Sequence, residues 1–278
     1  MTNRKFSISK VFIYISLVVA AIIAILPIVV VVFASFKTGD EFYSSGVMEL
    51  PDSFLNFENY KTAFIDGNML RGFGNTIIVI SASLFATIMT GTMTAYVLNR
   101  FRFKGRKLIS NLFLLASLIP SITMQMSVFQ IIDNLHLFNT FFSSIILFAG
   151  TDIISIYIFI QFMDSIPYSL DESAVMDGAG YCTVFFKIII PLLKPAIVTV
   201  LILKGVGFYN EFYTPYLYMP KAELAVISTA LFKFKGPYGT QWEVICAGVI
   251  ITLIPALLAF IFLQKKIYSG LVAGAVKE

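Results

Sequence analysis

The sequence predicts an all-α membrane protein with several spanning helices. Hydrophobic residues make up 58% of the 278-residue chain and charged residues only 13%, about half the charged share of roughly 25% that is usual in a soluble domain. Mean hydropathy is +0.86, and uninterrupted apolar runs reach the length of about 20 residues that crosses a bilayer as a helix. A soluble fold could not bury this much apolar surface.

Six stretches have the length and apolar content of a membrane-spanning helix. Four of them contain no charged residue, and these are 11–36, 72–99, 108–132 and 244–264. Two further stretches contain charges: 141–163 includes Asp152, and 196–217 includes Lys204 and Glu211. The first stretch is longer than the apolar region of a cleaved signal peptide, about 7–15 residues, so we expect it to be retained. The chain is therefore predicted to cross the membrane six times.

Lysine and arginine residues predict the orientation, because cytoplasmic loops carry an excess of them. With six spans, the two termini share a side with the second and fourth connections. These four segments hold thirteen basic residues, against six in the connections on the other side. Both termini are therefore expected in the cytoplasm. The fourth connection, 164–195, is an exception, because four acidic residues outnumber its two lysines.

The predicted layout has four parts. They are a cytoplasmic N-terminus with the first span (1–36), an external segment (37–71), a core of five spans that contains the connection 164–195 (72–264), and a cytoplasmic tail (265–278). Two cysteines and one histidine are too few for a disulfide framework or a histidine-rich metal site. A net charge of +4 without a long basic block does not indicate nucleic-acid binding.

The fourth connection has a local pattern that predicts short helices. Ser169, followed three residues later by Glu172, is a capping box that predicts a helix start. Gly178 and Gly180 predict that this helix ends just before them. Thr183 is the expected N-cap of a second helix that leads into the fifth span.

This connection resembles the cytoplasmic signature of ATP-binding-cassette (ABC) importer permeases, in which Glu-Ala-Ala is followed by Asp-Gly-Ala, Phe, Ile and two prolines. Nine residues match at the family's spacing without a gap: Glu172, Ala174, Asp177, Gly178, Ala179, Phe185, Ile188, Pro191 and Pro195. Ser173 replaces the first alanine, which is a change between two small residues. The resemblance implies the type I ABC importer permease fold.

The resemblance also implies a role for the connection. In the family it forms a coupling helix that sits in a cleft of the ATPase subunit and transmits its opening and closing. By resemblance, Glu172 contacts the ATPase and the side formed by Ala174 and Gly178 packs into its groove; Ser173, Asp177 and Ala179 complete the candidate coupling site. The alternative is a helix that lies on the membrane surface. Such a helix is rich in lysine and arginine, whereas this one is acidic.

Other segments resemble carbohydrate permeases of the maltose type. They are 33–37, 57–60, 74–76 and the tail 264–277, in which Val272 replaces a threonine. The resemblance implies the shorter, six-span member of a permease pair in a binding-protein-dependent sugar importer, most simply for an oligosaccharide or disaccharide. The implied partners are a second permease subunit that completes a heterodimer, two ATP-binding subunits and an external solute-binding protein, in the lipid of the bacterial inner membrane.

The chain itself is not expected to be an enzyme or to bind a cofactor. It lacks the Gly-x-x-x-x-Gly-Lys-[Ser/Thr] motif that holds nucleotide phosphates, so ATP and magnesium are expected in the partner ATPase subunits. Two other functions stay open. One is an ABC permease for a solute such as glycerol phosphate, and the other is an ion-coupled secondary transporter, which would leave the signature in 164–195 unexplained.

Three charged residues fall inside the predicted spans, where each would cost roughly 2.5–3.5 kcal/mol at the bilayer centre. At 1.5 Å per residue, Asp152 lies about 16 Å and Lys204 about 12 Å from the cytoplasmic ends of their spans, so an ion pair is possible. The pair would serve either to neutralise two charges or to take part in transport. Tyr209, Asn210 and Glu211 form a candidate sugar path, although tyrosines also gather at membrane interfaces.

Overall fold

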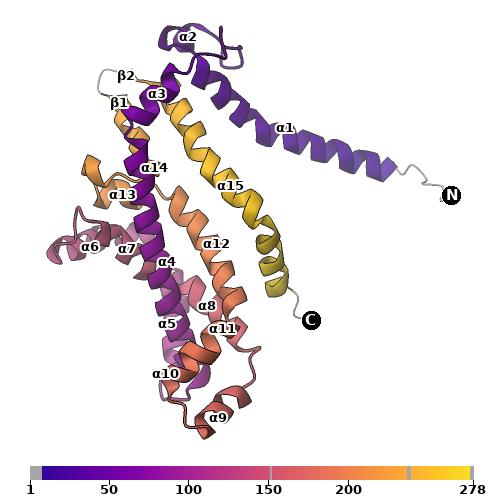
Figure 1. Ribbon diagram of the computed structural model, residues 1–278, viewed down its shortest axis with the longest axis vertical. Coiled ribbons are helices and arrows are strands. Elements are labelled where there is room, and N and C mark those ends of the chain that lie inside the picture. The colour runs from indigo at the N-terminus through magenta and orange to yellow at the C-terminus, as the bar shows by residue number, and fades with distance from the viewer. Residues whose placement is uncertain (1–7, 151, 237–238, 276–278) are drawn as a thin grey trace. The chain divides into compact units, whose positions relative to one another are not determined.

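The computed structural model describes residues 8–150, 152–236 and 239–275, most of them in helices (Figure 1). The chain divides into two compact units, one formed by the chain up to Leu70 with Ala230–Pro255 and the other by Arg71–Thr229 with the chain from Ala256. We describe each unit by itself. The second unit contains the predicted coupling site.

The first unit contains the first span and the external segment. Its elements are α1 (Ile8–Phe36), α2 (Gly39–Ser44), α3 (Glu58–Ile65), the 3-10 helix Leu231–Phe234, strands β1 (Lys235–Gly236) and β2 (Gly239–Thr240), and the first part of α15 (Trp242–Ala275). The strands form an antiparallel hairpin that pairs Lys235 with Thr240. Asn59 donates hydrogen bonds to the carbonyls of Ser35 and Lys37 at 2.9 and 2.7 Å, which fixes the turn after α1.

The second unit contains the long helix α4 (Met69–Arg100) and a series of shorter helices. These are α5 (Arg106–Ser117), α6 (Ser121–Asn134), α7 (Phe141–Gly150), α8 (Ile153–Met163), α9 (Ser169–Met176), α10 (Tyr181–Val184), the π-helix Phe185–Ile189, α11 (Ile190–Leu192), α12 (Lys194–Asn210), α13 (Tyr213–Tyr218), the 3-10 helix Ala222–Leu224 and α14 (Ile227–Ala230). In Figure 1, α9 and α10 lie at the lower end of this unit.

The described helices give six spans, as predicted, when each bent pair of helices is counted as one. Three spans are continuous: α1, α4 and α15. The others are α5 with α6, bent by 107°, α7 with α8, bent by 45°, and Tyr181–Leu192 with α12, bent by 70°. Pro120 precedes α6 at the first break, and proline disfavours helical backbone in the residue before it.

The predicted fifth span is wrong at its far end. Helix α12 stops at Asn210, and Glu211 has an extended backbone with ψ of 117°, so 196–217 is not one helix. The break falls at two polar residues, Asn210 and Glu211, and the expected span runs past them because aromatic residues follow.

The core of the second unit joins α4, α8 and the helices that lead into α12. Its buried residues are Ala95, Tyr96, Phe159, Met163, Ile166, Val184, Phe185, Ile189, Leu193, Ala196 and Val200. A Cβ on Gly91 would lie only 3.0 Å from Phe159 Cε2, so α4 and α8 approach closely at this glycine. The core includes Ile166, which precedes α9, and Val184, which follows it, so both ends of the connection that carries α9 are attached to this core.

Candidate functional site

Helix α9 begins as predicted at about Ser169, but by a different mechanism. The predicted capping box is wrong: the N-cap is Tyr168, and it makes no side-chain capping bond. The first turn starts at Pro167, whose carbonyl accepts from Leu170 N at 3.3 Å. Pro167 lies just before the N-cap, where its fixed φ restricts the direction in which the chain enters the helix.

The end of α9 is a Schellman motif built from the signature residues. Ala179 N donates to Ala174 O at 2.9 Å, and Gly178 N donates to Val175 O at 2.9 Å, which are the two bonds that define the motif. Gly178 has a φ of +88°, a left-handed conformation that glycine adopts without steric cost. The predicted stop at Gly178 is confirmed, and the Asp-Gly-Ala sequence has a structural role in this chain. The second helix begins after Gly180 as its N-cap, not after Thr183.

The outward face of α9 differs from the face that the resemblance implies. Ala174 and Ala179 are half-buried against the core of their own unit, so only part of the Ala174 side chain faces outward. The exposed residues of the loop include Glu172, Ser173, Val175, Met176, Asp177 and Gly178. Met176 is 87% exposed. This outward face combines two carboxylates with an apolar side chain.

Arg100 anchors α9 to the end of α4, which the sequence did not predict. Its Nε lies 2.9 Å from Asp171 Oδ2, and the Arg100 side chain is only 3% exposed. Its guanidinium donates to Ile166 O at 2.9 Å and lies 4.3 Å from the centre of the Tyr168 ring. In the sequence, Arg100 is one of five basic residues that indicate orientation, and nothing there distinguishes it from Arg102.

Asn99 extends this anchor on both sides. Its side chain donates to Asp164 Oδ1 at 2.7 Å, and its carbonyl accepts from the Tyr168 hydroxyl at 2.8 Å. Burial raises the pKa of Asp171 above the ordinary aspartate value, although the Arg100 charge opposes that shift. The ion pair is therefore not a large net source of stability, in keeping with the general behaviour of buried ion pairs.

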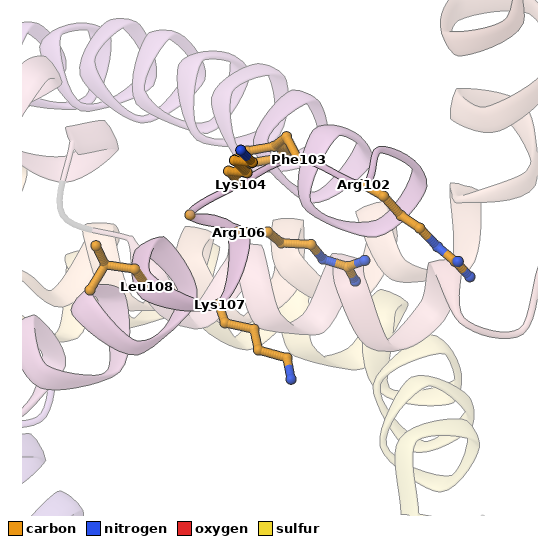
Figure 2. A pocket seen from close by; sticks show the side chains of 7 residues that line it. Arg102, Phe103, Lys104, Arg106, Lys107 and Leu108 are labelled. Atoms are coloured by element: carbon orange, nitrogen blue, oxygen red, sulfur yellow. The ribbon is translucent and has the colours of Figure 1, made fainter.

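The loop that follows Arg100 is strongly basic. Residues 102–108 surround a recess of about 650 Å³ between α4 and α5. Figure 2 shows the cationic groups of Arg102, Lys104 and Lys107 spread apart instead of converging on one point. The loop supplies positive surface charge, as expected of the side that faces anionic lipid.

The structure brings Asp152 and Lys204 together. Lys204 Nζ forms an ion pair with Asp152 Oδ1, and Asp152 also accepts from Ser155 N at 3.3 Å as the N-cap of α8. The break between α7 and α8 therefore places a buried carboxylate opposite α12. Both residues line a groove of about 560 Å³ among α7, α8 and α12.

The three candidate pathway residues do not share one site. Glu211 lines the same groove as Asp152 and Lys204, and its Oε1 accepts from the amides of Tyr213 and Thr214 at 3.0 and 3.1 Å. Asn210 is exposed, and its side chain donates to Val206 O at 2.9 Å. Tyr209 lines a separate, much smaller cavity.

Two aromatic residues that no sequence pattern predicted also line the groove. Phe148 and Phe208 both line it, and their rings stack at 4.6 Å between centroids. The groove thus combines apolar ring surface with two carboxylates and one ammonium group. Among the described residues, no group of three or more His, Cys, Asp or Glu side chains could hold a metal ion.

Residues 87–270 match the family described as the binding-protein-dependent transport system inner membrane component. The chain belongs to this family. The match includes all of the α9 connection and the groove, so both belong to the permease domain. The family resemblance stated from the signature is therefore confirmed, and this permease is a multi-pass protein of the inner membrane and a transporter component that works with a binding protein.

Relatives match this permease over nearly its whole length. One relative is GanQ of Bacillus subtilis, the galactooligosaccharides transport system permease protein. It is 32% identical to this chain, and the alignment covers 100% of this chain and 98% of the length of GanQ. AmyC of Thermoanaerobacterium thermosulfurigenes, described as a probable permease protein for starch degradation products, is 29% identical over 99% of this chain and 100% of its own.

A solved structure confirms the fold. One chain of a bacterial ABC transporter involved in the import of alginate has a TM-score of 0.78 to this permease at 21% identity, covering 95% of this chain and 98% of that one. A second structure of an alginate transporter, in complex with a sugar-bound periplasmic protein, has a TM-score of 0.56 at 19% identity over 92% of this chain. The ABC importer permease fold predicted from the signature is therefore correct.

Proposed function

We propose that this permease forms part of the membrane path of an ABC importer for a sugar, most simply an oligosaccharide or disaccharide. The relatives that match over their full length are named for galactooligosaccharides and for starch degradation products. The groove supports the proposal from the structure, because the half-buried ring of Phe208, beside two carboxylates and an ammonium group, suits a polyhydroxylated ring. Its volume lies within the usual range of about 300–1,000 Å³ for ligand sites.

We propose that α9 couples this permease to a separate ATPase subunit. Glu172, Ser173, Met176 and Asp177 form the docking face, because they point outward while Ala174 and Ala179 hold the helix to its own unit. Gly178 shapes the end of the helix. Helix α9 has no buried residue of its own and exposes three large apolar side chains, Leu170, Val175 and Met176, at 42%, 43% and 87%; apolar surface gathered on one short element is typical of an interaction site.

The complete transporter then has five subunits or more. Two ATP-binding subunits hold ATP and magnesium, a second permease subunit completes a heterodimer, and the solute-binding protein delivers the sugar from outside. Closure of the ATPase subunits around ATP shifts the permease pair between inward-facing and outward-facing states. The shift depends on how differently each partner binds the two states.

Uptake assays with a sugar panel test the proposed function. Cells that lack this permease gene should lose uptake of one class among radiolabelled maltotriose, arabinotriose and galactotriose, and the gene on a plasmid should restore it. Uptake of glycerol 3-phosphate serves as the non-sugar arm. Loss of glycerol 3-phosphate uptake alone would contradict the sugar proposal. Sugar uptake that persists without the ATPase gene but stops when the sodium or proton gradient is removed would contradict ABC coupling.

A further inference from the structure

Helix α9 is held by few contacts. It has eight residues and none of them is buried, and an isolated helix of this length is not stable in water. Its C-terminal end rests on Ala174 and Ala179. The N-terminal end is held by the ion pair of Asp171 with Arg100, by the stacking of Tyr168 on the same guanidinium and by the hydrogen bond from the Tyr168 hydroxyl to Asn99 O.

Arg100 is suited to hold this end in one orientation. Its planar guanidinium contacts Asp171, Ile166 O and the Tyr168 ring at the same time, a geometry that lysine cannot reproduce. The side chain is 3% exposed, so these contacts are shielded from solvent and salt. Because the ion pair adds little net stability when both groups are desolvated, its effect is mainly to fix position.

Arg100 also joins α9 to a helix that runs the length of the unit. It is the last residue of α4, which spans 32 residues. Near the other end of α4, Asn75 donates to the carbonyls of Glu223 and Ala225, both at 2.9 Å. A displacement of α9 therefore acts directly on α4, and α4 is bonded in turn to the segment that follows α13.

We propose that Arg100 is a positioning residue for coupling, which fastens α9 to α4 so that the two move as one body when the ATPase subunits close. The proposal rests on the proposed coupling function of α9. Without Arg100, α9 keeps its Schellman motif and its docking face, but the hydrogen bond from the Tyr168 hydroxyl to Asn99 O alone ties its N-terminal end to α4, so that end moves over a wider range. The ATPase subunits then still bind, and their movement is passed to α4 less completely.

The test measures the distance between α9 and α4 in the whole reconstituted transporter. Spin labels are placed at Val97 and at Leu170 in the first turn of α9, which are 45% and 42% exposed, after both native cysteines, Cys182 and Cys246, are replaced by serine. Electron resonance gives the distance distribution without nucleotide and again with magnesium ATP and vanadate. The variants are Arg100→Met and Arg100→Lys, and the control is Arg102→Met, which removes an exposed charge two residues away.

The proposal predicts a broader nucleotide-free distribution for Arg100→Met, a smaller broadening for Arg100→Lys, and no change for Arg102→Met. Sugar-independent ATP hydrolysis should persist in Arg100→Met, while the fraction of transporters that reach the vanadate-trapped distance falls roughly fivefold or more, as for an ordinary coupling interaction. Distributions of equal width in Arg100→Met and the parent protein would overturn the proposal. If the parent protein does not retain ATPase subunits on purification, the proposed coupling function is contradicted instead. The widths of the distance distributions measured without nucleotide would still decide the role of Arg100.

Discussion

Replacing Gly178 by alanine should loosen the end of α9 without touching the docking face. Gly178 has a φ of +88°, and a Cβ at this position would meet nothing within 4 Å. The cost is therefore backbone strain alone, about 1–2 kcal/mol for a left-handed residue other than glycine. That strain reduces the population of the capped helix relative to the open loop by roughly 5–30-fold.

Hydrogen exchange measured by mass spectrometry reads this population directly, because the amides of Gly178 and Ala179 are bonded only while the motif is closed. Two matched variants calibrate the measurement. Gly178→Asn should retain most of the protection, since asparagine tolerates the left-handed region. Gly180→Ser should leave the protection unchanged, because Gly180 has a φ of −72° at the N-cap of α10, where serine is favoured. Equal exchange in Gly178→Ala and the parent protein would refute the assigned role of Gly178.

Three further predictions concern the second unit. Asp152→Asn should lower permease stability, because it leaves the Lys204 ammonium without its carboxylate; since the Lys204 side chain is 24% exposed, the loss should fall below the roughly 3–5 kcal/mol of a fully buried pair. The thermal unfolding midpoint in detergent should recover in Asp152→Asn/Lys204→Met, and a double variant no better than the single one would argue against the pair. Asn75→Leu should cost about 1–3 kcal/mol by stranding two carbonyl acceptors, so an unchanged midpoint would count against these bonds. Glu211→Gln keeps a side-chain oxygen that accepts from the Tyr213 and Thr214 amides, so the unfolding midpoint should not change. Glu211→Leu removes that acceptor and should lower the free energy of unfolding by about 1 kcal/mol. A change in sugar uptake in Glu211→Gln at an unchanged midpoint would assign the charge to transport.

The sequence predicts the parts of this fold that depend on composition. Runs of apolar residues predict six spans, because spanning a bilayer needs length and apolarity and little else. The same signal does not reveal the direction of a helix, so hydropathy does not predict the 107° bend between α5 and α6. Gly178 is correctly predicted as a helix end because its effect is local.

The contacts of α9 with the rest of the chain are not predictable from local patterns. The capping box at Ser169 and Glu172 is wrong because Pro167 begins the turn and the Tyr168 side chain bonds Asn99. Arg100 and Asp171 are 71 positions apart, and only the tertiary fold pairs them. The same reason explains why Ala174, which the resemblance places against the ATPase, packs against its own unit.

Site-specific photocrosslinking at Met176 tests the central claim, that the outward face of α9 docks on the ATPase subunit. A photoreactive amino acid replaces Met176, 87% exposed, in one variant and Val47, 73% exposed in the predicted external segment, in the other. Irradiation of membranes that contain the whole transporter should join the Met176 variant to an ATP-binding subunit, and the Val47 variant should give no such product. Crosslinks to the ATPase subunit from Val47 and not from Met176 would contradict both the docking face and the orientation of the chain.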